Sequence, residues 1–209
     1  FYEEEIPVHY IYDGSWRHGS ALTVNFPYIY NIRLRLLGTA EGVELLLPVS
    51  PGQNSYDTRR FQWNAQSGWY AQETLYESPN MGCEEPEGAV DADQVPHWVW
   101  AEQDPENDGF FGIVEMTSDD AAPRWVARGA GYASGPAIAI PPDGQPIVTW
   151  TTDAFGIALS RYPYAEQRLL SEDGVGPQMT VDSEGHTHIV WYGFVNRPQQ
   201  IYYTTNAPS

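Results

Sequence analysis

The segment VDSEGHTHIVWYG at residues 181–193, followed by QQIYYTT at 199–205, decides the fold, because the chain repeats it. A second copy, VDADQVPHWVWAE at 90–102 followed by FFGIVEMT at 110–117, aligns with it without gaps over the first half. In both copies an Asp precedes a His by six residues, and a Trp follows that His three residues later. Such internal repeats predict a fold built from copies of one supersecondary unit.

The alignment defines a template of three positions. They are occupied by Asp91, His97 and Trp100 in one copy and by Asp182, His188 and Trp191 in the other. A third copy at 140–152, followed by GIALSRY at 156–162, keeps Trp150 but has Ile147 at the His position. A fourth at 2–14, followed by SALTVNF at 20–26, fits with Glu3, His9 and Tyr12. The chain therefore contains four visible copies.

Each copy is expected to form strands. The stretches HIVW, HWVW and IVTW are β-branched and aromatic, and Gly, Pro, Asn and Asp interrupt the chain before a helical face could run two turns. The template strand is apolar on both faces, which predicts sheets that are covered on both sides. The stretch between residues 30 and 85 lacks the template but contains four further candidate strands, at 31–37, 42–48, 59–64 and 69–76.

The repeat spacing predicts the architecture. The aromatic anchors at 100, 150 and 191 are separated by 50 and 41 residues, and the gap from Tyr12 to Trp100 is about two such units. This period, with four short strands a unit, is typical of an all-β propeller of about five four-stranded blades. We expect a single domain over 1–209 with units near 1–38, 39–85, 86–132, 133–174 and 175–209, of which the second is irregular.

The pattern of Asp, Gly, His, Val and Trp followed by Ile-Tyr-Tyr-Thr resembles the repeats of bacterial sialidase-like β-propeller proteins of the BNR or Asp-box type. The resemblance covers roughly 130 residues in four copies and implies the propeller architecture. The Asp-box itself, Ser-x-Asp-x-Gly-x-Thr-Trp, is not matched, because 171–174 and 183–185 are only partial. Sialidase activity is therefore not implied.

The last unit stops after QQIYYTT without an outer strand, and the first begins almost at its own template position. An unpaired strand edge favours association. Two expectations follow: the chain is part of a longer protein, or a partner covers the edge.

Acidic residues dominate the charge: 28 Asp and Glu stand against 10 Arg, for a formal net charge of −18. A surface of this sign repels phosphate, so no nucleic acid partner is expected. No apolar run reaches the roughly 18 residues of a membrane-spanning helix, so no membrane insertion is expected. The single Cys83 excludes an internal disulfide. Acidity with many Trp and Tyr predicts an extracellular, cell-surface or periplasmic location.

The loop QDPENDGFFGIVE at 103–115 is the candidate metal site. Its acids Asp104, Glu106, Asp108 and Glu115 nearly match the spacing with which carboxylates and a turn Gly wrap calcium. Flanking strands exclude an EF-hand, and the loop is similar to the calcium-binding hairpin loops of some propellers. The alternative is a solvated acidic turn, and calcium is the one cofactor suggested.

The recurring His residues, His9, His97 and His188, invite the idea of a shared metal site. Equivalent positions of different blades are related by rotation about the axis and lie apart. We therefore expect each His to hydrogen-bond the turn carboxylate of its own unit, so that the repeated residues serve the architecture. A metal held by the neighbouring His186 and His188 is the alternative.

Three aromatic residues, Trp63, Trp69 and Tyr70, belong to the irregular unit and escape the template. Aromatic residues outside the repeat are candidates to face a ligand or partner, and core packing is the alternative.

The sequence favours a non-catalytic extracellular β-propeller, a binding or assembly module that contacts a protein partner or a glycan. One alternative is a secreted glycoside hydrolase of the sialidase-like or five-bladed type. It would need two carboxylates roughly 5 to 10 Å apart, and no motif selects such a pair. A structural subunit of a larger complex is the second alternative. Fold does not decide among the three.

Overall fold

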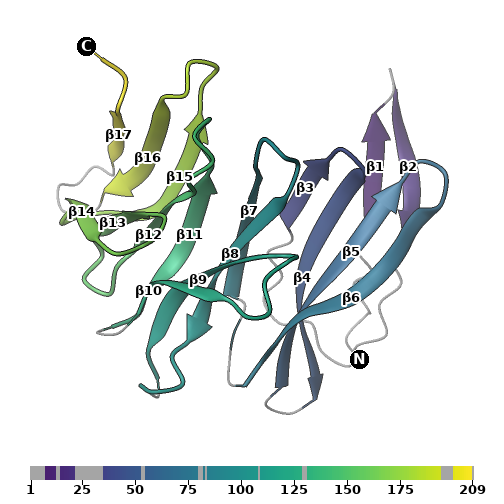
Figure 1. Ribbon diagram of the computed structural model, residues 1–209, viewed down its shortest axis with the longest axis horizontal. Coiled ribbons are helices and arrows are strands. Elements are labelled where there is room, and N and C mark those ends of the chain that lie inside the picture. The colour runs from purple at the N-terminus through teal and green to yellow at the C-terminus, as the bar shows by residue number, and fades with distance from the viewer. Residues whose placement is uncertain are drawn as a thin grey trace.

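The computed structural model describes residues 8–12, 15–21, 35–52, 55–79, 82, 84–107, 109–128, 131–193 and 200–208. In these residues 17 strands form five antiparallel sheets (Figure 1). The same residues contain no helix long and apolar enough to cross a lipid bilayer. The all-β prediction is confirmed.

The sheets follow one another along the chain. The first is the hairpin β1 (Val8–Tyr12) and β2 (Trp16–Ala21), and the second contains β3 (Arg35–Thr39), β4 (Gly42–Gly52), β5 (Ser55–Asn64) and β6 (Gly68–Ser78). The third contains β7 (Glu84–Val90), β8 (Pro96–Gln103), β9 (Phe111–Thr117) and β10 (Arg124–Ala127). The fourth contains β11 (Ser134–Ala139), β12 (Ile147–Thr151), β13 (Ile157–Arg161) and β14 (Gln167–Ser171). The last has three strands, β15 (Val175–Val181), β16 (Thr187–Gly193) and β17 (Gln200–Thr205).

The sheets stack face to face in chain order. Strand β3 contacts β7, β7 contacts β11, and β11 contacts β15, so the first strands of successive sheets are neighbours. The β1–β2 hairpin lies against β6. Figure 1 shows the hairpin and the sheet β15–β17 at opposite ends of this row. The arrangement is that of consecutive propeller blades.

The repeat template supplies the second strand of three sheets, and the segment that follows it supplies the third. Strand β8 pairs with β9, β12 with β13 and β16 with β17 in matching register, because the template Trp faces Val114, Ala158 and Tyr202 respectively. Three strands predicted in the irregular unit lie in β4, β5 and β6. The fourth, at 31–37, reaches β3 from residue 35 onward, and its first four residues lie outside the described part.

A left-handed residue closes the turn before each of these template strands. Gly144 and Gly185 hold the position at φ 74° and 87°, and Gln94 holds it at φ 66° in the third sheet. The amide of this left-handed residue donates to the backbone carbonyl three residues earlier: Gln94 donates to Asp91, and Gly185 donates to Asp182. Glycine adopts this conformation at little cost, which explains the turn glycines of the repeat.

The first strands of three sheets share a bulge before a buried proline. The residue before the proline is left-handed: Glu85, Gly135 and Gly176 have φ of 53°, 55° and 61°. The amide of Gly135 donates to the Glu85 carboxylate, and the amide of Gly176 donates to Thr151 Oγ1 at 3.1 Å. Both amides therefore take their acceptor from the preceding sheet.

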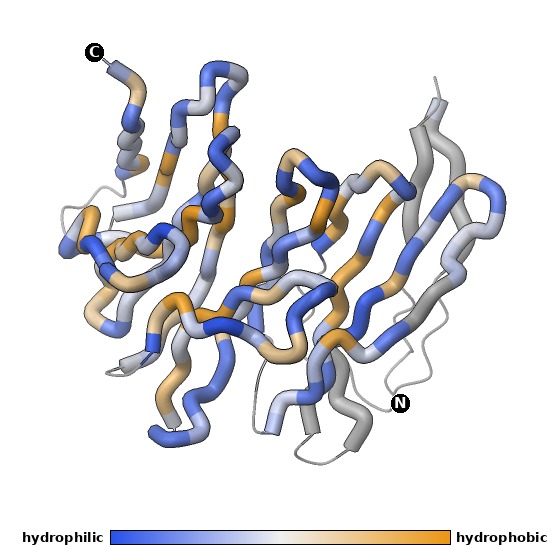
Figure 2. The backbone as a smooth tube through the Cα atoms, in the orientation of Figure 1, coloured by the Kyte–Doolittle hydropathy of each residue, from blue (hydrophilic) through white to orange (hydrophobic). Residues whose placement is uncertain are grey.

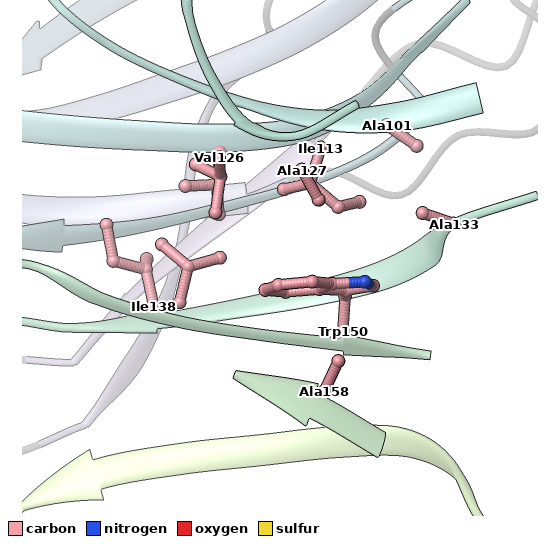
Figure 3. Close-up of a cluster of buried hydrophobic side chains, with 10 residues drawn as sticks. Ala101, Ile113, Val126, Ala127, Ala133, Ile138, Trp150 and Ala158 are labelled. Atoms are coloured by element: carbon pink, nitrogen blue, oxygen red, sulfur yellow. The ribbon is translucent and has the colours of Figure 1, made fainter. Parts of the chain in front are cut away.

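Apolar cores fill the spaces between sheets, and Figure 2 shows hydrophobic stretches along the strands within the row. Between β3–β6 and β7–β10 lie Leu46, Trp98, Trp100, Val114 and Met116. Between β7–β10 and β11–β14 lie Val99, Ala101, Ile113, Val126, Ala127, Ala133, Ile138, Val148, Trp150 and Ala158. Figure 3 shows Trp150 between Ala127 of the one sheet and Ala158 of its own. Between the last two sheets lie Ile157, Ile189 and Trp191.

The prediction that template strands are covered on both faces is correct for β8 and β12 and wrong for β16, and the side chains of β1 lie outside the described part of the chain. Every residue of β12, and every residue of β8 except the last, is buried. In β16 burial alternates, and Val190 and Tyr192 are 37% and 55% exposed. The physical reason is that one face of β15–β17 packs against no sheet in the described residues.

Candidate functional site

The template Asp organises the turn of its own sheet. Asp91 Oδ1 accepts hydrogen bonds from the amides of Asp93 at 2.9 Å and Val95 at 2.8 Å. Its other oxygen, Oδ2, lies 3.4 Å from His97 Nε2. The carboxylate therefore joins the turn to the strand that follows it.

The last sheet repeats this geometry. Asp182 Oδ1 accepts from the amides of Glu184 and His186, both at 2.9 Å, and Oδ2 lies 2.9 Å from His188 Nε2. The hydrogen bond from His188 and those from the turn hold the pKa of Asp182 below its usual range. His186 Nδ1 lies 3.3 Å from the same oxygen, so both His residues bind Asp182.

His97 and His188 each have a second partner on the third strand of their sheet. His97 Nδ1 lies 2.6 Å from Glu115 Oε1, and His188 Nδ1 lies 2.7 Å from Tyr203 Oη. Glu115 and Tyr203 are equivalent, because each faces the template Val between the His and the Trp. Burial lowers the pKa of His97, but its bonds to Glu115 and Asp91 outweigh burial and raise it above the usual value.

The degenerate copy in β11–β14 has lost all three groups together. Pro141 stands at the Asp position and Ile147 at the His position. Leu159 lies opposite the template Thr149, where the sheets β7–β10 and β15–β17 have Glu115 and Tyr203. A polar bridge needs all its members, so their joint replacement by apolar residues leaves no unpaired group. In this geometry His97 and His188 each link the turn of their own sheet to its third strand.

The template Trp residues lie inside the row of sheets. Trp100, Trp150 and Trp191 are buried, and Trp100 Nε1 donates to Glu102 Oε2 at 2.8 Å. His9 and Tyr12 lie on β1, and their side chains are outside the described part of the chain.

The acids of the candidate calcium loop have protein cations as partners. Asp104 and Glu106 both bind Arg128, at 3.1 and 2.9 Å from its Nη2. Glu115 is fully buried within its sheet between His97 and Arg124, and Asp108 lies outside the described residues. In the described residues no group of three or more His, Cys, Asp or Glu could hold a metal. Calcium binding stays a prediction, which thermal melting with and without chelator would test.

The aromatic residues of the irregular unit lie on one hairpin. Trp63 of β5 and Trp69 of β6 face each other across the strands, and the next residue, Tyr70, is 48% exposed. None of the three contributes to the pocket described next. Their role in ligand or partner contact stays a prediction.

A pocket of about 370 Å³ lies between the sheets β7–β10 and β11–β14. Its lining comprises Phe111, Gly112, Ala127, Arg128, Gly131, Tyr132, Ala133, Trp150, Thr152, Asp153, Ala154 and Gln167. The lining residues come from strand ends of the two sheets and from the connection between them. Sequence reasoning missed the pocket because its residues come from two repeat copies, and only the packing of the sheets brings them together.

The aromatic wall is fixed by polar and ring contacts. Tyr132 is 41% exposed, its Oη donates to Glu84 Oε2 at 3.0 Å, and its ring centroid is 5.0 Å from that of Phe111. Burial and the nearby charge of Glu84 raise the pKa of Tyr132 to about 12, so the hydroxyl stays protonated at neutral pH.

Arg128 is held rigidly at the pocket wall. Its Nη2 and Nε both bind Asp104 Oδ1, and its guanidinium carbon lies 5.1 Å from the ring centroid of Trp125. The hydrogen bond and charge of Asp104 raise the pKa of Arg128. Because the two carboxylates of Asp104 and Glu106 exceed its single positive charge, Arg128 brings no excess of positive charge to the pocket.

The pocket therefore combines apolar rings with a few fixed donors and acceptors. Asp153 is the one carboxylate among its described lining residues. Such a site suits an uncharged ligand that carries hydroxyl groups on an apolar frame.

Comparisons with known proteins show similarity at the level of structure. No protein-family model matches the sequence, and no curated protein matches it. An endo-arabinase from Bacteroides thetaiotaomicron has a TM-score of 0.54 and 14% identity, over 93% of this chain and 82% of the enzyme. TolB from Acinetobacter baumannii has a TM-score of 0.61 and 9% identity, over 98% of this chain and 47% of TolB.

A xylan β-1,4-xylosidase from Bacillus halodurans C-125 has a TM-score of 0.52 and 13% identity, over 91% of this chain and 45% of that enzyme. The chain thus spans about half the length of TolB and of the xylosidase. At these identities the likeness carries the fold alone, which is an all-β fold of the propeller type. The resemblance to sialidase-like repeats stays a prediction.

Proposed function

We propose that the chain is a carbohydrate-binding β-propeller module whose five described sheets are blades, the β1–β2 hairpin included, and whose ligand occupies the pocket at Tyr132. The observation that carries the proposal is the lining itself. Rings of Phe111 and Tyr132 stand beside the fixed guanidinium of Arg128 and the polar side chains of Asp153 and Gln167. Sugars present apolar C–H faces to such rings and hydroxyls to such polar groups.

The size of the pocket supports a small ligand segment. Its volume of about 370 Å³ falls near the lower end of the range of roughly 300 to 1,000 Å³ for small-molecule sites. One or two sugar units fit such a space. The two enzymes similar in fold are named for arabinan and xylan chemistry, so pentose oligosaccharides are the first ligands to test.

Charge favours binding over hydrolysis. Glycoside hydrolysis requires a pair of carboxylates that flank the scissile bond. Asp153 alone among the described lining residues is acidic, and Asp104 and Glu106 are engaged by Arg128. This arrangement supports a non-catalytic module, acting outside the cytoplasm as its composition predicts.

Calorimetric titration with arabino- and xylo-oligosaccharides tests the proposal. We expect binding that falls at least tenfold in Tyr132→Ala and is unchanged in the matched variant Tyr70→Ala, whose ring is similarly exposed on β6. Loss of binding in Tyr70→Ala with full binding in Tyr132→Ala would move the site to the β5–β6 hairpin and overturn the proposal.

One observation favours glycoside hydrolysis as a second candidate function. Glu84, hydrogen-bonded to Tyr132, places a second carboxylate beside the pocket that Asp153 lines. Release of reducing ends from arabinan or xylan, abolished by Glu84→Gln and by Asp153→Asn, would support this candidate over simple binding.

A further inference from the structure

An apolar surface covers one face of the last sheet. It consists of Val190 and Tyr192 on β16 and Ile201 and Tyr203 on β17, hereafter the β16–β17 face. Val190 pairs with Tyr203 and Tyr192 with Ile201, so the four side chains form one contiguous block. They are 37%, 55%, 73% and 58% exposed. A block of this kind on an exposed sheet indicates an interaction surface.

The repeat shows what this face is built for. Ile113, Ile157 and Ile201 occupy one template position, because each pairs with the residue that follows the template Trp. The first two are fully buried, whereas Ile201 is 73% exposed. The same residue at the same position is a core residue in two sheets and a surface residue in the third.

The covering partner at the two complete interfaces is the template strand of the next sheet. Ile113 packs with Trp150 of β12, and Ile157 packs with Trp191 of β16. The β16–β17 face therefore matches a sheet that presents an aromatic template strand. Such a sheet would continue an interface that the molecule already uses twice.

In the described residues, the same sheet ends at β17 without a fourth strand. It has three strands, whereas each of the three preceding sheets has four. Its outer strand β17 has the sequence QIYYTT, without charge or proline, which is the composition that edge strands avoid when they stay unpaired. The described part of the sheet therefore leaves both a face and a strand edge uncovered, and a stacked sheet would cover the face.

The chain itself contains one template strand at the far end of the row. Strand β1 carries Tyr10 and Tyr12 at the register positions of Trp98 and Trp100, and no described sheet precedes it. Because β1–β2 and β15–β17 lie at opposite ends of the row, β1 of the same molecule does not meet the β16–β17 face (Figure 1).

We propose that the β16–β17 face binds the β1–β2 end of a second copy of this chain, head to tail. This contact is heterologous, so it generates either a closed ring or a growing array. The net charge of −18 opposes the approach of two copies, whereas the four residues of the face are uncharged. Association should therefore strengthen as added salt screens the repulsion.

Sedimentation velocity over a hundredfold concentration range tests the proposal, in reducing buffer because Cys83 could otherwise form an intermolecular disulfide. We expect the mass to rise above 23.5 kDa with concentration and with salt. Ile201→Arg should weaken association at least tenfold. The matched variant Leu169→Arg, at a residue 53% exposed on β14, should associate like the wild type.

Two further variants keep the test decisive. Tyr192→Ser, a milder change on the face, should also weaken association if circular dichroism shows that Ile201→Arg fails to fold. Tyr12→Arg should weaken association as much as Ile201→Arg, and wild-type association in Tyr12→Arg would overturn the head-to-tail contact. A mass of 23.5 kDa at every concentration and salt would overturn the proposal and leave the face to another occupant.

Discussion

The sheets β7–β10 and β15–β17 contain the same sequence template in different surroundings. In both, a turn Asp binds a strand His, and the His binds a third-strand residue. In the first sheet the His and its partner Glu115 are buried, whereas in the second His188 is partly accessible and Tyr203 is 58% exposed. The template therefore sets local geometry, and the neighbouring sheet sets how much each contact contributes to stability.

The largest difference between the two sheets should come from their equivalent isoleucines. Ile113→Ala should lower the free energy of unfolding by about 2–5 kcal/mol, because it leaves a cavity at a fully buried site. Ile201→Ala should change it by less than about 0.5 kcal/mol in the monomer, because its side chain is largely exposed. Urea denaturation of both variants measures the two values. Similar losses would show that the β16–β17 face is covered in solution.

The paired histidines should differ next. His97→Ala should cost about 1–3 kcal/mol, because it leaves the buried Glu115 without one of its partners. His188→Ala should cost less than about 1 kcal/mol, because water can reach Asp182 and Tyr203. Chemical denaturation at neutral pH compares them. A larger loss in His188→Ala would contradict the role assigned to burial.

The pH dependence of stability should also distinguish the sheets. The pKa of His97 is raised in the folded state, so its protonation stabilises the fold fully below the unfolded value of about 6.5. This contribution is lost as the pH rises through the folded pKa. Unfolding experiments between about pH 6 and pH 9 should show the loss in the wild type. It should disappear in His97→Gln and persist in His188→Gln; persistence in both would assign it to another group.

A smaller effect than that of Ile113→Ala or His97→Ala should come from the first strands. Gly176→Ala should cost about 1 kcal/mol, because the residue has φ of 61° and the nearest atom to an added Cβ, on Tyr192, lies 3.8 Å away. The cost would then be conformational rather than steric. Thermal melting measures it, and an unchanged midpoint would show that the bulge relaxes.

Much of the fold could be predicted because the repeat carries its own register. The His and Trp of one copy identify the template strand. The Ile near the start of the following segment identifies the strand that pairs with it. The His–Asp contact also follows from the six-residue interval, since the turn returns the chain to the start of the strand. The irregular unit lacks the template, so its strands carry no such register, and alternation with period two marks only the segment at 31–37.

The candidate site could not be predicted, because no sequence interval encodes contacts between blades. Tyr132 and Phe111 meet where the connection before β11 forms a parallel β-bridge with the start of β9, 21 residues earlier in the chain. The calcium spacing at Asp104 leaves out Arg128, which lies 24 residues later and returns to the same carboxylate. The exposure of Ile201 likewise depends on what packs against its sheet and not on the residue itself, because Ile113 and Ile157 at the same template position are buried.

The backbone amides at the bulges of β11 and β15 limit how a single sheet of this fold can be transplanted or duplicated. The amide of Gly135 donates to the Glu85 carboxylate of the sheet β7–β10, and the amide of Gly176 donates to the Thr151 hydroxyl of the sheet β11–β14. A single sheet therefore does not supply acceptors for all of its own backbone amides. A transplanted or duplicated sheet must bring an acceptor for a backbone amide of the sheet that follows it, either a carboxylate on its first strand, like Glu85, or a hydroxyl directly after the template Trp, like Thr151.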